Sequence, residues 1–175
     1  MEAWQIILLI LVILIFLYLG LLVYVMSMIA HFSGRLKKRL VAISVLFSEK
    51  KGILQAIGAE FKKANLKLTL ADNAAVINLD SIAASAIKEG DVIPTSAKLK
   101  EIQKRFNFIA ETNSWEDSTG DYRSLTASLH DLDANYRQSI ALYNSDATAY
   151  NYWIHTPLFK WLAWLLGHRS KEPLN

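Results

Sequence analysis

The hydrophobic and polar positions of this chain follow one pattern up to about residue 30 and another pattern after it. Residues 3–30 form a run of 28 residues without Asp, Glu, Lys, Arg or His. At about 1.5 Å per residue a helix of this length reaches roughly 42 Å, which exceeds the ~30 Å hydrocarbon core of a bilayer. The run therefore predicts a single transmembrane helix, with Trp4 near one end and Tyr18 and Tyr24 toward the other.

The residues on either side of the run favour a retained anchor over a cleaved signal peptide. A signal peptide has positive residues before a shorter apolar stretch and a small-residue cleavage site after it. Here Glu2 precedes the run and basic residues follow it. We expect residues 1–32 to stay as a membrane anchor.

After the anchor, apolar residues recur at spacings of three and four, which is the pattern of amphipathic helices. The spacing predicts helices over residues 35–64 and 73–88, a break at Gly90 and Pro94, and a third helix capped by Thr95 or Ser96. The stripes of the first and third helices are Leu36, Leu40, Ile43, Phe47, Leu54, Ile57 and Phe61, and then Leu99, Ile102, Phe106 and Ile109.

The fourth predicted helix has the clearest pattern. Its apolar positions recur every seven residues from residue 122 to about 155, which corresponds to a helix of about 54 Å. One set of positions is Tyr122, Leu129, Tyr136, Tyr143 and Tyr150, and the flanking set is Leu125, Leu132, Ile140, Ala147 and Ile154. We interpret the tyrosines as core rings whose hydroxyls find polar partners at the edge of the core.

These elements predict an all-α protein, in which the anchor is followed by an extended antiparallel four-helix bundle with coiled-coil packing over residues 33–155. Residues 66–70 and 114–120 are expected to connect helices. Lys50 interrupts the first stripe, and we expect its stem to lie along the apolar surface while its ammonium reaches water.

Residues 156–175 are predicted to form a short apolar helix and a polar tail. Thr156 and Pro157 suit a helix start, Leu158 to Leu166 is almost entirely apolar, and Gly167 ends it. Two interpretations stay open: Trp161 and Trp164 place this helix in the membrane interface, or the helix plugs the open end of the bundle as core.

Charge is distributed unevenly, although the net charge is only +3. Between residues 31 and 69 there are nine Lys or Arg against two Glu, and between residues 101 and 155 there are four against eight acidic residues. Basic residues beside a span mark its cytoplasmic side, which predicts a cytoplasmic domain and an external amino terminus. The membrane-flanking set is Arg35, Lys37, Lys38 and Arg39.

Catalytic chemistry is not visible in the sequence. There is no Cys, and the seven glycines are spread singly, so no thiolate site or glycine-rich phosphate loop is expected. His130, Asp131 and Asp133 form the one local cluster with metal character, and we interpret it as a solvated helix face. We expect no catalytic residue, cofactor, metal or small-molecule substrate.

The carboxy-terminal third resembles the LemA family of bacterial membrane-anchored proteins. The resemblance rests on Tyr143 and Asn144, on Tyr150 and Asn151 seven residues later, and on the following segment with Ile154, Pro157 and Gly167. It implies an extended four-helix bundle at the bacterial inner membrane and no established enzyme activity. Gly52, Ile53, Leu54, Gln55 and Ala56 replace a family segment in the first helix, and His168 replaces an aromatic residue. An Asn that follows a core Tyr is suited to satisfying a neighbouring backbone group.

Function is therefore predicted at the level of class. The first hypothesis is a membrane-anchored, non-catalytic scaffold or interaction protein, whose partners are the lipid bilayer and a second copy or other membrane proteins, and which organises or shapes the membrane. The alternatives are a binder of anionic lipid or nucleic acid through the basic first helix, with nucleic acid disfavoured by the nearby membrane, and an accessory subunit of a membrane enzyme.

Overall fold

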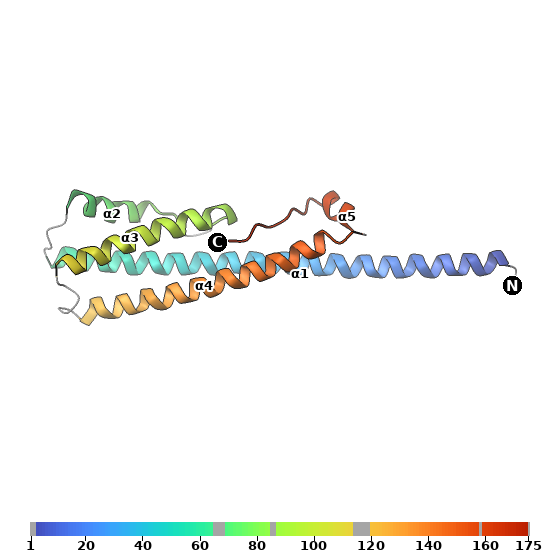
Figure 1. Ribbon diagram of the computed structural model, residues 1–175, viewed down its shortest axis with the longest axis horizontal. Helices are drawn as coiled ribbons and strands as arrows, with labels where there is room; N and C mark the ends of the chain where they lie inside the picture. The colour runs from blue at the N-terminus through green and yellow to red at the C-terminus, as the bar shows by residue number, and fades with distance from the viewer. Residues whose placement is uncertain (1–2, 65–68, 85–86, 114–119, 158, 175) are drawn as a thin grey trace. The chain divides into compact units, whose positions relative to one another are not determined.

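The computed structural model describes residues 3–64, 69–84, 87–113, 120–157 and 159–174, and these residues form helices and connections with no strand. The predicted all-α class is confirmed. Figure 1 shows the elements, which are α1 (Ala3–Lys63), α2 (Leu70–Ser81), the 3-10 turn η1 (Glu89–Asp91), α3 (Val92–Thr112), α4 (Gly120–Ile154) and α5 (Lys160–Leu165). Residues 1–2, 65–68, 85–86, 114–119, 158 and 175 lie outside the described residues; parts of the predicted anchor, second helix, connections, last helix and tail fall on them.

The chain divides into two compact units, and α1 and α4 contribute to both. The first unit comprises Met1–Lys37 and Asn144–Pro173, and the second comprises Lys38–Tyr143 and Leu174–Asn175.

Helix α1 merges two elements that the sequence predicts as separate. The apolar run and the first amphipathic stripe form one uninterrupted helix of 61 residues. Within the described residues it is the one helix long and apolar enough to cross a membrane, and none of its most apolar window is buried. The predicted helix of transmembrane length is confirmed.

In the second unit, the predicted stripe of α1 faces the core. Ile43, Phe47, Leu54, Ile57 and Phe61 are all at most 2% exposed. Helices α1 and α4 run antiparallel, because their contacts pair rising with falling residue numbers: Phe47 with Tyr136, Lys50 with Asp133, and Phe61 with Tyr122.

The stripe of α3 is also buried as predicted. Leu99, Ile102, Phe106 and Ile109 are at most 7% exposed, and the Phe106 ring meets Phe61 of α1 edge to face at 5.5 Å. Phe61 therefore contacts both α3 and α4, and its ring lies where three helices meet.

Helix α2 begins three residues earlier and ends seven residues earlier than the predicted range 73–88. It starts at a capping box, in which the Thr69 side chain accepts the N–H of Asp72 and the Asp72 carboxylate accepts the N–H of Thr69. It ends at Ser81, where the Lys51 ammonium donates to the carbonyls of Asp80 and Ile82. This long-range capping of the last turn is invisible to local periodicity.

Asp72 also ties α2 to α3. Its buried carboxylate accepts a hydrogen bond from Arg105 Nε at 2.6 Å. Burial alone would raise the pKa of Asp72, but the hydrogen bonds from Thr69 and Arg105 outweigh it and hold the pKa below the ordinary value of 3.8.

Replacing Asp72 by Asn is therefore expected to lower the free energy of unfolding by about 1.5–3 kcal/mol at pH 7, the typical worth of a hydrogen bond to a charged group. A carboxylate with a depressed pKa stabilises the fold above its unfolded-state pKa and loses this contribution as pH falls through the folded-state pKa. The difference between the two proteins should shrink below about pH 4. Denaturant unfolding at several pH values measures this difference, and the exposed Asp131→Asn protein is the control. A difference in the free energy of unfolding that stayed constant down to pH 2 would refute the prediction.

Helix α3 begins earlier than predicted, at Val92 and not at a cap formed by Thr95 or Ser96. The turn η1 leads directly into it, and Pro94 lies in its first turn. Proline is tolerated there because the first N–H groups of a helix have no partner within the helix. The predicted break at Pro94 is therefore wrong, and Thr95 is a buried residue inside the helix.

The prediction for Lys50 is also wrong. Its side chain is only 12% exposed, and its ammonium pairs with Asp133 Oδ1 of α4 at 2.6 Å. Gln103 of α3 donates to the other carboxylate oxygen at 3.2 Å. Lys50 thus joins three helices through an ion pair and does not extend into water.

Candidate functional site

The most unusual surface of the first unit is the start of α1. Every residue from 3 to 21 is exposed, whereas Val25 and Ile29 are 1% exposed. At about 1.5 Å per residue the exposed section is about 28 Å long, close to the thickness of a bilayer core. The core helix of a soluble protein is mostly buried, whereas this apolar section is exposed on every side.

Aromatic side chains gather where this exposed section ends. Phe159, which immediately precedes α5, stacks on Tyr18 with ring centroids 5.6 Å apart. Trp153 at the end of α4 meets Tyr24 edge to face at 5.7 Å. Helix α5 therefore lies beside the apolar section of α1, at the level of Tyr18.

Helix α5 is shorter than predicted and begins at Lys160. Thr156 does not cap it, because its hydroxyl donates to the Tyr152 carbonyl of α4. Its carbonyl instead accepts the N–H groups of Phe159 and Lys160, which forms a turn before the helix. Gly167 ends the helix as predicted.

The stop at Gly167 is a Schellman motif. Gly167 has φ +74°, its N–H donates to the Trp164 carbonyl, and the N–H of His168 donates to the Ala163 carbonyl. A left-handed residue of this kind is nearly always glycine. The motif sends the chain back along α4.

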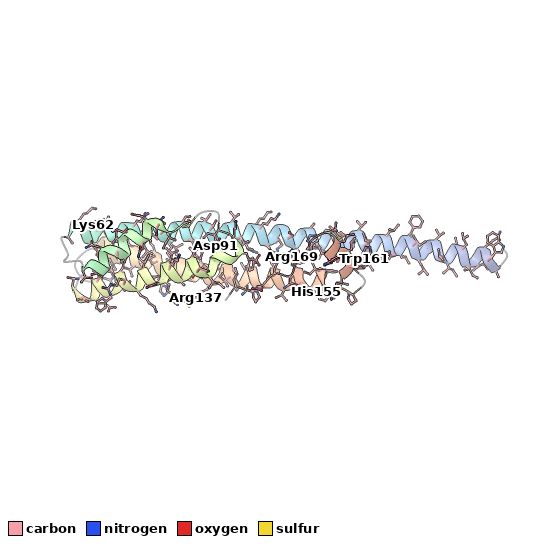
Figure 2. The ribbon with its side chains drawn as sticks, turned by 90° about the horizontal axis from the view of Figure 1, so that it is seen from above. Lys62, Asp91, Arg137, His155, Trp161 and Arg169 are labelled. Carbon is pink, nitrogen blue, oxygen red and sulfur yellow. The ribbon has the colours of Figure 1, made fainter. Side chains whose placement is uncertain are left out.

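The side chains of α5 favour the interface interpretation over the core plug. Ala163 is buried, as is Phe159 before the helix, but Trp161 is 54% exposed, Trp164 79% and Leu165 65%. A core plug would bury these three. Figure 2 shows Trp161, His155 and Arg169 gathered around α5.

The second Tyr-Asn pair holds the tail after α5 against α4. Tyr150 Oη lies 3.0 Å from His168 Nδ1. Asn151 donates to the Lys171 carbonyl and accepts the Lys171 N–H, both at 2.8 Å. His155 Nε2 lies 2.8 Å from Ser170 Oγ. Asn151 thus pairs with backbone groups, as the sequence predicted for such an Asn, and we call these contacts the tail clasp.

The first Tyr-Asn pair has a different environment. In the second unit, Tyr143 is fully buried, and its hydroxyl has no partner in hydrogen-bond geometry among the described residues. Burial raises the pKa of this phenol, and the nearby Glu89 carboxylate adds to the rise. The Glu89 carboxylate is therefore the polar neighbour of the Tyr143 hydroxyl, although the two groups do not meet in hydrogen-bond geometry. Asn144 is half-buried in the first unit.

Of the predicted membrane-flanking cations, Arg35 is paired within the protein. Its guanidinium contacts the buried carboxylate of Asp146 at 2.9 Å and lies 5.7 Å from the Phe32 ring centroid. Sequence reasoning missed Asp146, because no local signal links it to Arg35. Lys37 and Lys38 are exposed, and Arg39 is half-buried.

The predicted cluster of His130, Asp131 and Asp133 is not brought together as a metal site. Asp133 binds Lys50 and Gln103, while His130 and Asp131 are exposed. Over the described ranges no group of three or more His, Cys, Asp or Glu residues could hold a metal ion.

A groove of about 1150 Å³ runs between α2 and α3 in the second unit. Asp91, Glu101, Lys98 and Arg105 line it together with apolar residues such as Ile82 and Phe108. Because both acidic and basic residues line the groove, its charge does not indicate one class of ligand. The chemically distinctive surface in the described structure is therefore the apolar section of α1 with α5 and its basic tail.

No protein-family model, curated protein or solved structure matches this chain.

Proposed function

We propose that this protein is a membrane-anchored, non-catalytic helical scaffold or interaction protein of the bacterial inner membrane. Residues 3–21 cross the bilayer, and residues 33–155 form an antiparallel four-helix bundle on the cytoplasmic side. The observation that carries the proposal is the section of α1, about 28 Å long, that is apolar and exposed all round.

Three further features support this function. Aromatic residues lie at the ends of the exposed section, as in membrane-interface belts. The exposed cations Lys37 and Lys38 follow it on one side, which agrees with the positive-inside rule. The resemblance to the LemA family agrees with an anchored helical protein.

Binding of nucleic acid through the basic first helix is less well supported. Several of its cations are used inside the protein: Arg35 pairs with Asp146, Lys50 with Asp133, Lys51 with two carbonyls, and Lys63 with Glu60. Nucleic-acid affinity depends on cations that can neutralise phosphates. The basic first helix therefore has fewer such cations than its sequence suggests.

The topology has a direct test, since the sequence contains no cysteine. In intact cells, a Cys at the exposed Ser128 is expected not to react with a membrane-impermeant maleimide until the membrane is permeabilised. A Cys at Glu2 is the matched external control and is expected to react at once. Reaction at position 128 in intact cells would overturn the cytoplasmic assignment.

If the protein is a scaffold, we expect it to have stable binding partners in the membrane. A photo-crosslinking residue at Ile77, which is 69% exposed, is expected to give a discrete adduct in native membranes, either a dimer of this chain or one with another membrane protein. The buried stripe of α1 needs no second copy to cover it, so partners would use such exposed positions. The same residue at the buried Leu79 is the control, and monomer alone at both positions would contradict the role.

A further inference from the structure

We propose that α5 and the tail after it form a second membrane contact that binds anionic phospholipid. In this site, Trp161, Trp164 and Leu165 enter the boundary between head groups and acyl chains, while Lys160 and Arg169 bind the lipid phosphate. The inference rests on the proposed function, because it requires α1 to cross the bilayer.

The ring contacts set the level of α5 along the span. Tyr18, on which Phe159 stacks, lies three residues before the end of the exposed section. Trp153 contacts Tyr24, six residues further along α1, or about 9 Å at about 1.5 Å per residue. The chain thus passes from Trp153 to Phe159 toward the bilayer and reaches its boundary at α5.

The outward face of α5 is suited to this position. Trp161, Trp164, Leu165 and Leu166 are between 53% and 79% exposed, and contiguous exposed apolar surface marks a site of interaction. Tryptophan favours the head-group region of bilayers, and leucine favours the acyl region. The adjoining surface of α1 is the apolar section that lipid would surround. The same lipid layer would therefore contact the exposed face of α5.

The charge of this segment selects the lipid. Helix α5 and the tail after it contain the cations Lys160, Arg169 and Lys171 and one acidic residue, Glu172. Lys160 and Arg169 are exposed at the two ends of α5 and its turn. Ammonium and guanidinium groups form strong hydrogen bonds with phosphate, and anionic head groups attract basic segments at the membrane surface.

The tail clasp fixes this arrangement. Tyr150, Asn151 and His155 hold residues 168–171 against α4. Arg169 therefore stays at the same end of the unit as the tryptophans of α5 and does not move with a loose tail. The side chains of Tyr150 and Asn151 act here as positioning residues for the lipid site.

The depth of α5 can be measured in the full chain reconstituted in phosphatidylcholine nanodiscs, with or without phosphatidylglycerol. A Cys at Trp164 carries an environment-sensitive fluorophore, and a Cys at the exposed Ser145 on α4 is the control. We expect strong quenching at position 164 by lipids with a nitroxide near the head group, and weak quenching at 145. A fluorophore at position 164 that reports a water-exposed environment would overturn the proposal. So would a fluorophore that reports an apolar environment but is not quenched by the lipid nitroxides, because protein and not lipid would then cover it.

Lipid selectivity is measured with the same fluorophore. Nitroxide-labelled phosphatidylglycerol is expected to outcompete labelled phosphatidylcholine by about fivefold per cation, and the Lys160→Glu, Arg169→Glu variant should abolish the preference. The charge-matched Lys98→Glu, Lys104→Glu variant on α3 should retain it. Equal association of the two lipids with the unmodified chain would overturn the anionic assignment.

Carbonate extraction separates this inference from the proposed function. A chain that resists extraction but shows no quenching at 164 retains its anchor and refutes only the second contact. A chain that carbonate releases from the membrane refutes both.

Discussion

The Ile10→Lys, Leu14→Lys protein is expected to disappear from the membrane fraction. The two residues are 52% and 59% exposed and lie one helical turn apart in the apolar section of α1. Each Lys near the centre of a span costs about 2.5–3.5 kcal/mol for insertion, and each lost Ile or Leu removes a further few tenths. Together they should reduce insertion by more than about a thousandfold.

The same helix supplies the control for this experiment. Val41 and Val45 are also exposed, at 63% and 49%, and one turn apart on α1, but they lie beyond the apolar run. The Val41→Lys, Val45→Lys protein is expected to remain in the membrane fraction. Equal fractionation of the two double variants, measured after carbonate treatment, would contradict a transmembrane role for residues 3–21.

The second large effect is expected in the helical core. Replacing Phe61 by Ala should lower the free energy of unfolding by about 3–5 kcal/mol, since large aromatic truncations lose burial and leave a cavity. Phe61 is fully buried and contacts Phe106 and Tyr122 on two other helices. Denaturant unfolding of the detergent-solubilised full chain, followed by circular dichroism, measures the loss.

Phe108 provides the matched comparison, because it is 56% exposed on α3. The Phe108→Ala protein should unfold within about 0.5 kcal/mol of the unmodified chain, as most surface substitutions do. If the two alanine variants lost equal stability, the assignment of Phe61 to the core would be wrong.

The sequence predicted the features that are repeated along one helix. The apolar run and the stripes of α1, α3 and α4 follow directly from residue spacing, because burial on one side of a helix has the period of the helix itself. Tyr122, Tyr143 and Tyr150, for example, are all at most 4% exposed. This periodicity is a property of single elements and needs no knowledge of their partners.

Helix ends were harder to predict, because side chains from elsewhere decide several of them. Lys51 of α1 binds the last carbonyls of α2, and Thr156 serves α4 instead of capping α5. The start of α2 was predictable, since Thr69 and Asp72 have the spacing of a capping box. Helical periodicity alone does not show this start, because the capping box precedes the first periodic apolar residue.

The candidate site has features that follow from residue type and spacing, and features that depend on long-range contacts. The apolarity of Trp161, Trp164 and Leu165 is readable, but their exposure depends on how Phe159 meets Tyr18. The tail clasp joins residues 15 to 20 positions apart, and Lys50 finds Asp133 at a separation of 83 residues. Such pairings come from tertiary structure and leave no local pattern.

If residues 3–21 lie within a bilayer, water reaches no side of the helix over that section. Single cysteines placed in turn from Trp4 to Ala30 of the full chain, and probed in native membranes with a water-soluble maleimide, test it most directly. We expect one continuous unreactive stretch from about residue 6 to residue 20, on every side of the helix, with reactivity returning at Ser27. Reactive positions recurring every three or four residues inside that stretch would show a helix with one face in water, and would contradict the claim.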